Sequence, residues 1–195
     1  MVKVGRRPGT PETRSRILEA ARTAFGERGF NATTIRAVAA EAGVDPALVH
    51  HYFVTKADLY AAAIEIPLSP STVIPQVFGG EVSGLGRRVT EFFFSVWEAP
   101  DSRRPLLAML GGAFGGNDRG IAGFREFLVS GLLDRAVAAI GGGRGAEERV
   151  ELAMAHLLGI AVLRYVVVLE PLASLEVPRL VDLVAPRVQS YFDGV

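Results

Sequence analysis

Residues of the types that contact nucleic acid gather between positions 33 and 56, on two short predicted helices. Histidine, tyrosine and lysine side chains can donate hydrogen bonds to phosphates, while Ala47 or Leu48 can contact a thymine methyl group. Thr33 is expected to cap a helix over 34–42, whose N-terminus favours an anionic phosphate. The candidate DNA-binding residues are Thr33, Thr34, Arg36, Ala47, Leu48, His50, His51, Tyr52 and Lys56.

A helical wheel separates the two faces of the second short helix, predicted from Asp45 to about Phe53. Val49 and Phe53 fall on one side, which is expected to face a core. Ala47, His51 and Val54 point the opposite way and form the expected groove-facing surface. An α-helix is narrow enough to enter the major groove, so this face is the candidate reader of base edges.

The two short helices are joined by the sequence Ala-Gly-Val-Asp at 42–45. Gly43 permits a tight turn, Asp45 can cap the next helix, and Pro46 suits its first position because the missing N–H has no partner there anyway. A glycine-bearing turn between two short helices is typical of a helix-turn-helix.

Helical periodicity extends over the rest of the chain, which predicts an all-α fold of about nine or ten helices. An apolar stripe runs from Ile17 to Phe25 in a first helix that ends at Gly29, and a fourth helix is expected from Thr55 to Pro67. No segment alternates with period two. The later helices, separated by Gly and Pro, are expected over 68–79, 84–99, 103–114, 118–140, 146–170 and 178–193.

The segment TTIRAVAAEAGVDPALVHHYFVTKADLY resembles the DNA-binding domain of the TetR family of repressors. Gly43, Val44, Phe53, Lys56 and Leu59 match the pattern of that family. The chain departs from it in having a histidine, rather than the usual tyrosine, after Val49 and an aspartate, rather than serine or threonine, as the cap. The resemblance covers roughly 11–60, and 68–195 resembles the family's C-terminal domain more loosely.

Composition and the resemblance together predict a three-part organisation. Residues 1–10 would be a flexible basic arm, 11–66 a helix-turn-helix domain, and 67–195 a ligand-sensing and dimerisation domain. Residues 1–22 carry six basic and two acidic side chains, a net +4, on a chain of zero net charge. A basic end on a neutral chain favours contact with a polyanion there, although a solubilising tail would have the same composition.

The resemblance also implies a homodimer formed by the last two long helices, and the composition of 146–170 agrees with it. Its segment LLGIAVLRYVVVL is apolar around the whole circumference. Such a helix is expected to be buried on all sides, and a second subunit is the simplest cover.

An effector of the C-terminal domain is expected to be a small hydrophobic or aromatic molecule held between its helices. Aromatic and thioether side chains are abundant there, and one histidine and one arginine lie in an apolar helix. Ordinary core packing, with the two polar groups bonded internally, is the competing interpretation. The candidate ligand-binding residues are Phe93, Trp97, Met109, Phe114, Phe127, His156 and Arg164.

Several function classes are disfavoured by the residues. The chain has no cysteine, which excludes disulfides and thiol chemistry. His50 and His51 are adjacent rather than spaced i, i+4, and the glycines at 111–116 and 141–145 precede no Lys-Ser/Thr, so no metal site, phosphate loop or cofactor is expected. No catalytic constellation is recognisable, so no enzyme is expected. A helical adaptor and a DNA-binding protein without a ligand remain as alternatives.

The compartment is expected to be the cytoplasm. The start of the chain is polar and lacks the apolar segment of a signal peptide. The longest apolar run, at 157–172, is interrupted by Arg164 and is too short for a membrane span.

Overall fold

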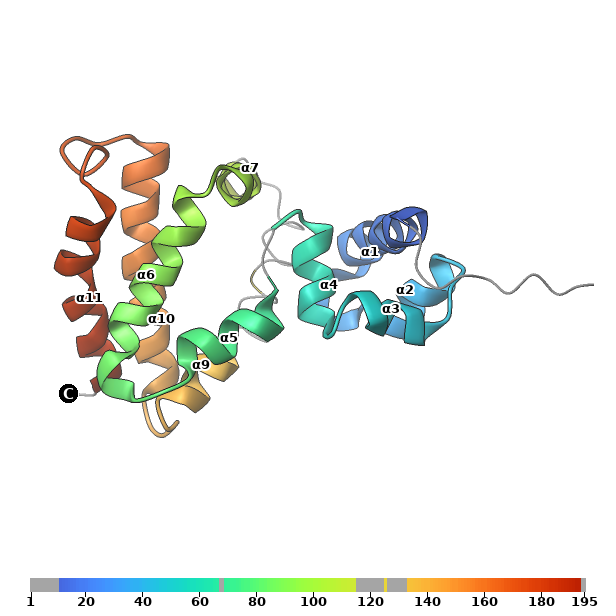
Figure 1. Ribbon diagram of the computed structural model, residues 1–195, viewed down its shortest axis with the longest axis horizontal. Coiled ribbons are helices and arrows are strands. Elements are labelled where there is room, and N and C mark those ends of the chain that lie inside the picture. The colour runs from blue at the N-terminus through green and yellow to red at the C-terminus, as the bar shows by residue number, and fades with distance from the viewer. Residues whose placement is uncertain (1–10, 67–68, 115–124, 126–132, 194–195) are drawn as a thin grey trace, which may run out of the picture.

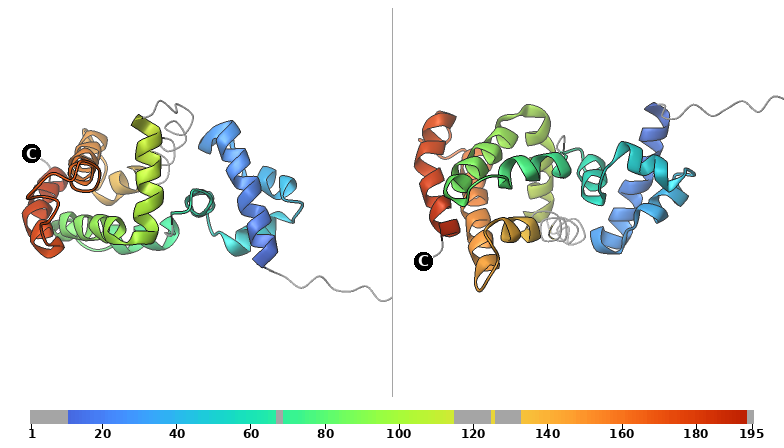
Figure 2. Two further views of the ribbon diagram at one scale, coloured as in Figure 1. Left: turned by 90° about the horizontal axis from the view of Figure 1, so that it is seen from above. Right: turned by 60° about the horizontal axis from the view of Figure 1, so that its bottom comes forward.

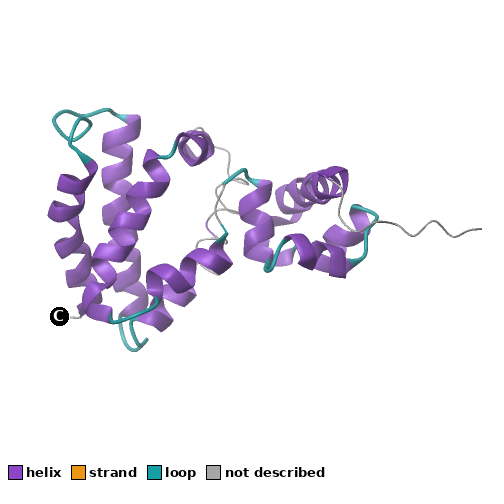
Figure 3. Ribbon diagram, viewed as in Figure 1, coloured by secondary structure: helices purple, strands orange, loops and turns teal. Residues whose placement is uncertain are grey.

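The computed structural model describes residues 11–66, 69–114, 125 and 133–193. Within this part of the chain every regular element is helical, comprising ten α-helices, a short 3-10 turn and a π-helical turn (Figure 3). The expected all-α fold is therefore confirmed. In the same residues no helix combines the length and apolar character needed to cross a membrane.

Four helices form an N-terminal module at the right of Figure 1. They are α1 (Pro11–Ala32), α2 (Ile35–Glu41), α3 (Pro46–Tyr52) and α4 (Lys56–Ala63). The remaining helices form a C-terminal module, in which α6, α10 and α11 lie side by side (Figures 1 and 2). These helices are α5 (Pro70–Phe78), α6 (Leu85–Glu98), α7 (Pro100–Phe114), α9 (Asp134–Ala139), α10 (Ala146–Ala161) and α11 (Val177–Asp193).

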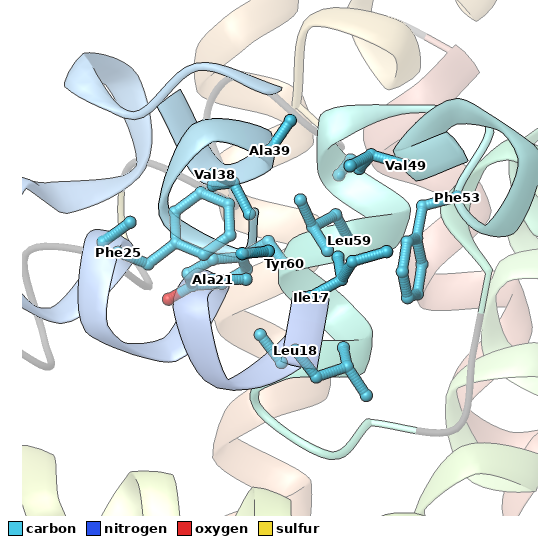
Figure 4. Close-up of a cluster of buried hydrophobic side chains, with 14 of the residues drawn as sticks. Ile17, Leu18, Ala21, Phe25, Val38, Ala39, Val49, Phe53, Leu59 and Tyr60 are labelled. Atoms are coloured by element: carbon cyan, nitrogen blue, oxygen red, sulfur yellow. The ribbon is translucent and has the colours of Figure 1, made fainter. Parts of the chain in front are cut away.

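The core of the N-terminal module follows from the apolar stripe of α1. Ile17 and its neighbours at helical spacing are buried against Val38, Val49 and Leu59, one residue from each of the other three helices (Figure 4). The ring of Tyr60 meets that of Phe25 edge-on, with centroids 4.9 Å apart. All four helices thus share one core, which fixes how α3 is held.

The end of α1 is shaped by Gly29 and a buried threonine. Gly29 has φ 77° and ψ 174°, which interrupts the helical backbone before Ala32. The hydroxyl of Thr33 donates to the carbonyls of Ala24 (3.0 Å) and Gly29 (2.8 Å). These contacts tie the residue before α2 to the last turns of α1.

The C-terminal module is built on the contact between α6 and α11. A Cβ atom placed on Gly86 would lie 2.5 Å from the backbone nitrogen of Gln189, so only glycine permits this approach. The side chain of Gln189 accepts a hydrogen bond from the Gly86 N–H (2.6 Å) and donates one to the Val82 carbonyl (2.9 Å). Phe94 of α6 and Val188 of α11 are buried in one hydrophobic core.

The predicted helix over 146–170 ends earlier than its composition suggested. α10 stops at Ala161 and continues as a π-helical turn over Val162–Val166. Residue 168 has a left-handed backbone (φ 55°), and Pro171 disfavours helical geometry in the residue before it. Of the helix expected over 118–140, α9 is the described portion, and 118–124 and 126–132 lie outside the described residues.

Candidate nucleic-acid interface

The turn between α2 and α3 is closed by backbone hydrogen bonds and by an arginine of α1. Gly43 takes φ +63°, which lets the Val44 N–H donate to the Ala39 carbonyl (2.9 Å). Arg16 Nη2 donates to the carbonyls of Ala42 (2.6 Å) and Gly43 (3.3 Å). The turn is therefore bound to α1, and the angle between α2 and α3 is set by all three helices.

Both short helices begin with a side-chain cap. Thr34 Oγ1 accepts from the Ala37 N–H (3.1 Å) at the start of α2, and Asp45 Oδ1 accepts from the Ala47 N–H (2.8 Å) at the start of α3. Each cap satisfies an N–H that the first helical turn leaves without a partner.

The expectation that Thr33 caps α2 and faces DNA is wrong. Thr33 is fully buried, and its hydroxyl is bonded to α1 as described above. The neighbouring Thr34 is exposed and supplies the cap. Two adjacent threonines look alike in sequence, and the kink at Gly29 determines which one turns inward.

One face of α3 is exposed in the way that the helical wheel predicted. Val49 is fully buried and Phe53 nearly so, whereas Ala47, His51 and Val54 are exposed. The remaining candidates of this helix also reach the surface, Leu48 and Tyr52 being half-buried and His50 exposed. Arg36 of α2 is exposed as well.

Lys56 has a structural partner in addition to any phosphate it could meet. Its Nζ donates to the Phe30 carbonyl (3.0 Å) and lies 4.4 Å from the centroid of the Phe30 ring. The ammonium thus joins the start of α4 to the end of α1. Its sequence neighbours gave no sign of this contact, since Phe30 is 26 positions earlier.

The candidate ligand-binding residues divide into two places. Trp97 is buried, with Phe93 6.0 Å away and Tyr165 stacked on it at 5.3 Å between ring centroids. His156 instead lies against Tyr191 of α11, its Nδ1 3.4 Å from the phenolic oxygen. The side chains of Met109 and Phe114, and the whole of Phe127, lie outside the described residues.

Arg164 is bonded within the protein, as the core-packing interpretation expected. Its Nη2 lies 2.9 Å from Glu98 Oε1, and its Nη1 donates to the carbonyls of Leu172 (2.6 Å) and Leu175 (2.8 Å). Tyr165 donates to the same oxygen of Glu98 at 2.8 Å. This anchors the segment after α10 to the end of α6.

The hydrogen bonds among Glu98, Arg164 and Tyr165 shift the pKa values of Glu98 and Tyr165. Burial alone would raise the pKa of Glu98, but the bonds from Tyr165 and Arg164 hold it below its usual range. Burial, together with the neighbouring Glu98 carboxylate, raises the pKa of Tyr165 to about 12. The sequence offered one signal for Glu98, namely that a buried arginine such as Arg164 needs a carboxylate partner.

Comparisons with known proteins agree with this geometry. The family model for bacterial regulatory proteins of the tetR family matches residues 17–63. The model for the tetracyclin repressor-like C-terminal domain matches residues 83–192. The first match covers the helix-turn-helix, and the second covers more than half of the chain.

Individual relatives match over different lengths. The transcriptional regulator UidR of Escherichia coli K12 is 38% identical over 52 residues, which are 27% of this chain and 26% of UidR. A solved TetR-family regulator from Streptomyces coelicolor is 36% identical, with 97% of this chain and 99% of that chain covered and a TM-score of 0.51. The SmeT–triclosan complex shares the fold at 21% identity, with 92% and 90% covered and a TM-score of 0.50.

Proposed function

The chain belongs to the TetR family of transcriptional regulators, and from this premise we propose that it is a cytoplasmic repressor that binds a palindromic operator as a homodimer. A small hydrophobic or aromatic effector would release it. The observation that carries the proposal is the exposed face of α3, held on a turn that is bonded to α1. Such a rigid, exposed helix suits insertion into a major groove.

DNA binding is supported by the chemistry of this face. His50 and His51 present ring nitrogens, and Ala47 presents a methyl group for a thymine. The start of α2, capped by Thr34 and with the exposed Arg36 two residues later, is suited to a phosphate. Phosphate contacts would position the module, and α3 would supply the base contacts.

Dimerisation is supported by an exposed apolar stripe on α10 and the π-helical turn after it. Leu152 is 54% exposed, Leu163 40% and Val166 44%, and the small residues Ala155 and Gly159 lie between them. A Cβ atom on Gly159 would meet nothing within 4 Å, so the backbone there is open to close approach. A second copy of the chain would cover this surface.

An apolar effector is supported by an aromatic cluster of the C-terminal module, in which Tyr165 stacks on Trp97 and the tilted ring of Phe93 lies beside Trp97. The SmeT–triclosan complex is a case of an aromatic compound bound to a protein of this fold. Effector binding would displace α4 and change the spacing of the two α3 helices by a few ångströms. A coupling of ~1–3 kcal/mol is sufficient for a 5- to 150-fold loss of operator affinity.

The test begins with duplexes selected from a random pool by the wild-type protein. His51→Ala is expected to change the preferred bases at the positions that α3 reads, while Arg104→Ala, on the exposed surface of α7, leaves them unchanged. Lys56→Ala is expected to weaken binding to all sequences and to flatten the logarithmic salt dependence by about one. A selected pool with no consensus, or one that His51→Ala leaves unaltered, would contradict base reading by α3.

A further inference from the structure

A single buried carboxylate receives hydrogen bonds from both modules of the protein. Asp58 Oδ2 accepts from the N–H (3.0 Å) and the hydroxyl (2.8 Å) of Thr55. Its other oxygen, Oδ1, accepts from the hydroxyl of Ser69 (2.7 Å) and the N–H of Ser71 (3.0 Å). Only 6% of the Asp58 surface is exposed.

The two carboxylate oxygens belong to different parts of the structure. Thr55 caps α4, which packs on α1 and whose last turn is held by Arg22, since Arg22 Nε donates to the Ala63 carbonyl at 2.9 Å. Ser69 and Ser71 begin α5, which packs against α6 and α9 of the C-terminal module. Asp58 therefore links the helix-turn-helix module to the C-terminal module through one side chain.

The carboxylate is held in its charged form by neutral donors. Burial alone would raise the pKa of Asp58, but the bonds from Ser71, Ser69 and Thr55 lower it below the usual value. Hydrogen bonds to an ionised acceptor are about twice as strong as those between neutral groups. Loss of one donor should therefore alter the hydrogen bonds that the remaining donors make to the Asp58 carboxylate.

Thr55 and Asp58 lie shortly after α3, the helix proposed to read DNA bases. α3 ends at Tyr52, Phe53 is buried in the shared core, and Thr55 follows two residues later. We propose that Asp58 is an interdomain latch that keeps the start of α4 in register with α5 and so passes movements of α5 to the C-terminal end of α3. Its role in effector release rests on the proposed function, but the latch itself does not.

Amide hydrogen exchange tests the latch without operator or effector. The N–H groups of Thr55 and Ser71 are themselves donors to Asp58, and the Phe53 N–H donates to the Val49 carbonyl at the end of α3 (2.9 Å). Ser69→Ala removes one donor on the α5 side alone. It is expected to accelerate exchange about tenfold at Ser71, and also at Thr55 and Phe53.

The reverse perturbation is the second arm, since coupling is reciprocal. Thr55→Val removes both a donor to Asp58 and the hydroxyl that accepts from the Asp58 N–H at the cap of α4, and it is expected to accelerate exchange at Ser71. Thr72→Ala is the matched control, because its hydroxyl lies in the same turn of α5 and donates to the Ser69 carbonyl without reaching Asp58. It is expected to leave Thr55 and Phe53 unchanged.

The proposal is overturned if Ser69→Ala accelerates exchange at Ser71 alone, because the bond would then be local to α5. It is also overturned if Thr72→Ala produces the same changes at Thr55 and Phe53. A failure to find an operator would refute the proposed function and leave these exchange results intact.

Discussion

At the scale of single residues, the arginines of the chain serve the ends of helices more than the sequence suggested. Arg16 donates to the carbonyls that follow α2, Arg22 to the end of α4, and Arg88 to Val77 O near the end of α5. The last carbonyls of a helix have no partner within it, and a guanidinium satisfies them while complementing the helix dipole. These roles depend on tertiary proximity, so composition could only assign Arg16 and Arg22, in the basic segment 1–22, to contact with a polyanion.

Two glycines of the N-terminal module should respond in opposite ways to alanine. Gly43 has φ +63°, where a Cβ is strained, so Gly43→Ala is expected to lower the free energy of unfolding by ~1–2 kcal/mol. Gly26 is exposed within α1 and has open space around it, so Gly26→Ala should raise this free energy by about 0.5–1 kcal/mol. Urea denaturation measures both, and equal effects of the two changes would contradict the turn geometry.

The Tyr165 phenol should ionise about two pH units later than an ordinary tyrosine. Its folded pKa of about 12 exceeds the usual 10.0, so its contribution to stability is complete below pH 10 and is lost as the pH rises toward 12. Trp97 is stacked on this ring, and a tyrosinate there should quench its fluorescence. Alkaline titration of Trp97 fluorescence measures the transition. Tyr165→Phe should abolish it, and a midpoint near 10 would refute the perturbed acidity.

At the scale of helices, local signals predicted the N-terminal module well. The cap of α3, the proline at its first position and the glycine turn were predicted from the sequence, and the stripe of α1 gave its buried face. The cap of α2 was assigned to Thr33 instead of Thr34. The C-terminal part was harder, because the end of α10 depends on a π-helical turn that brings Arg164 to Glu98, 66 positions earlier. Apolar composition alone extended that helix to 170. The carboxylate of Asp58 was also missed, although Thr55 and Asp58 have capping-box spacing.

The cap of α3 should determine both stability and recognition. Asp45→Ala leaves the Ala47 N–H without its acceptor and is expected to lower the free energy of unfolding by ~1 kcal/mol, whereas Asp45→Ser retains a cap. Operator affinity should fall in the same order, because the first turn of α3 carries Ala47. Thermal unfolding and DNA titration of the two variants provide the comparison. Indistinguishable variants would mean that the cap is unimportant here.

At the scale of the whole molecule, the exposed stripe of α10 is the surface that most needs a partner. Leu163→Glu is expected to be tolerated in an isolated subunit, where the side chain is 40% exposed. In the proposed dimer it would bury an unpaired charge and so separate the subunits. Sedimentation should therefore show folded monomers of the variant. Val54→Glu, which places a charge on an exposed apolar site of the other module, is the control and should remain dimeric. A wild-type protein that is itself monomeric at micromolar concentration would contradict the assembly.

The close approach of Gly86 to Gln189 is the point at which α6 and α11 lie nearest to a backbone collision. The two backbones are so close there that a Cβ atom on Gly86 would collide with the backbone of Gln189. A tilt of α6 against α11 would be centred on this contact. Glu98 lies 12 residues farther along α6, or about 18 Å at the helical rise, so a rotation of about 10° would displace it by about 3 Å. A small tilt at the start of α6 would therefore produce a larger displacement at its end, where Glu98 binds Arg164.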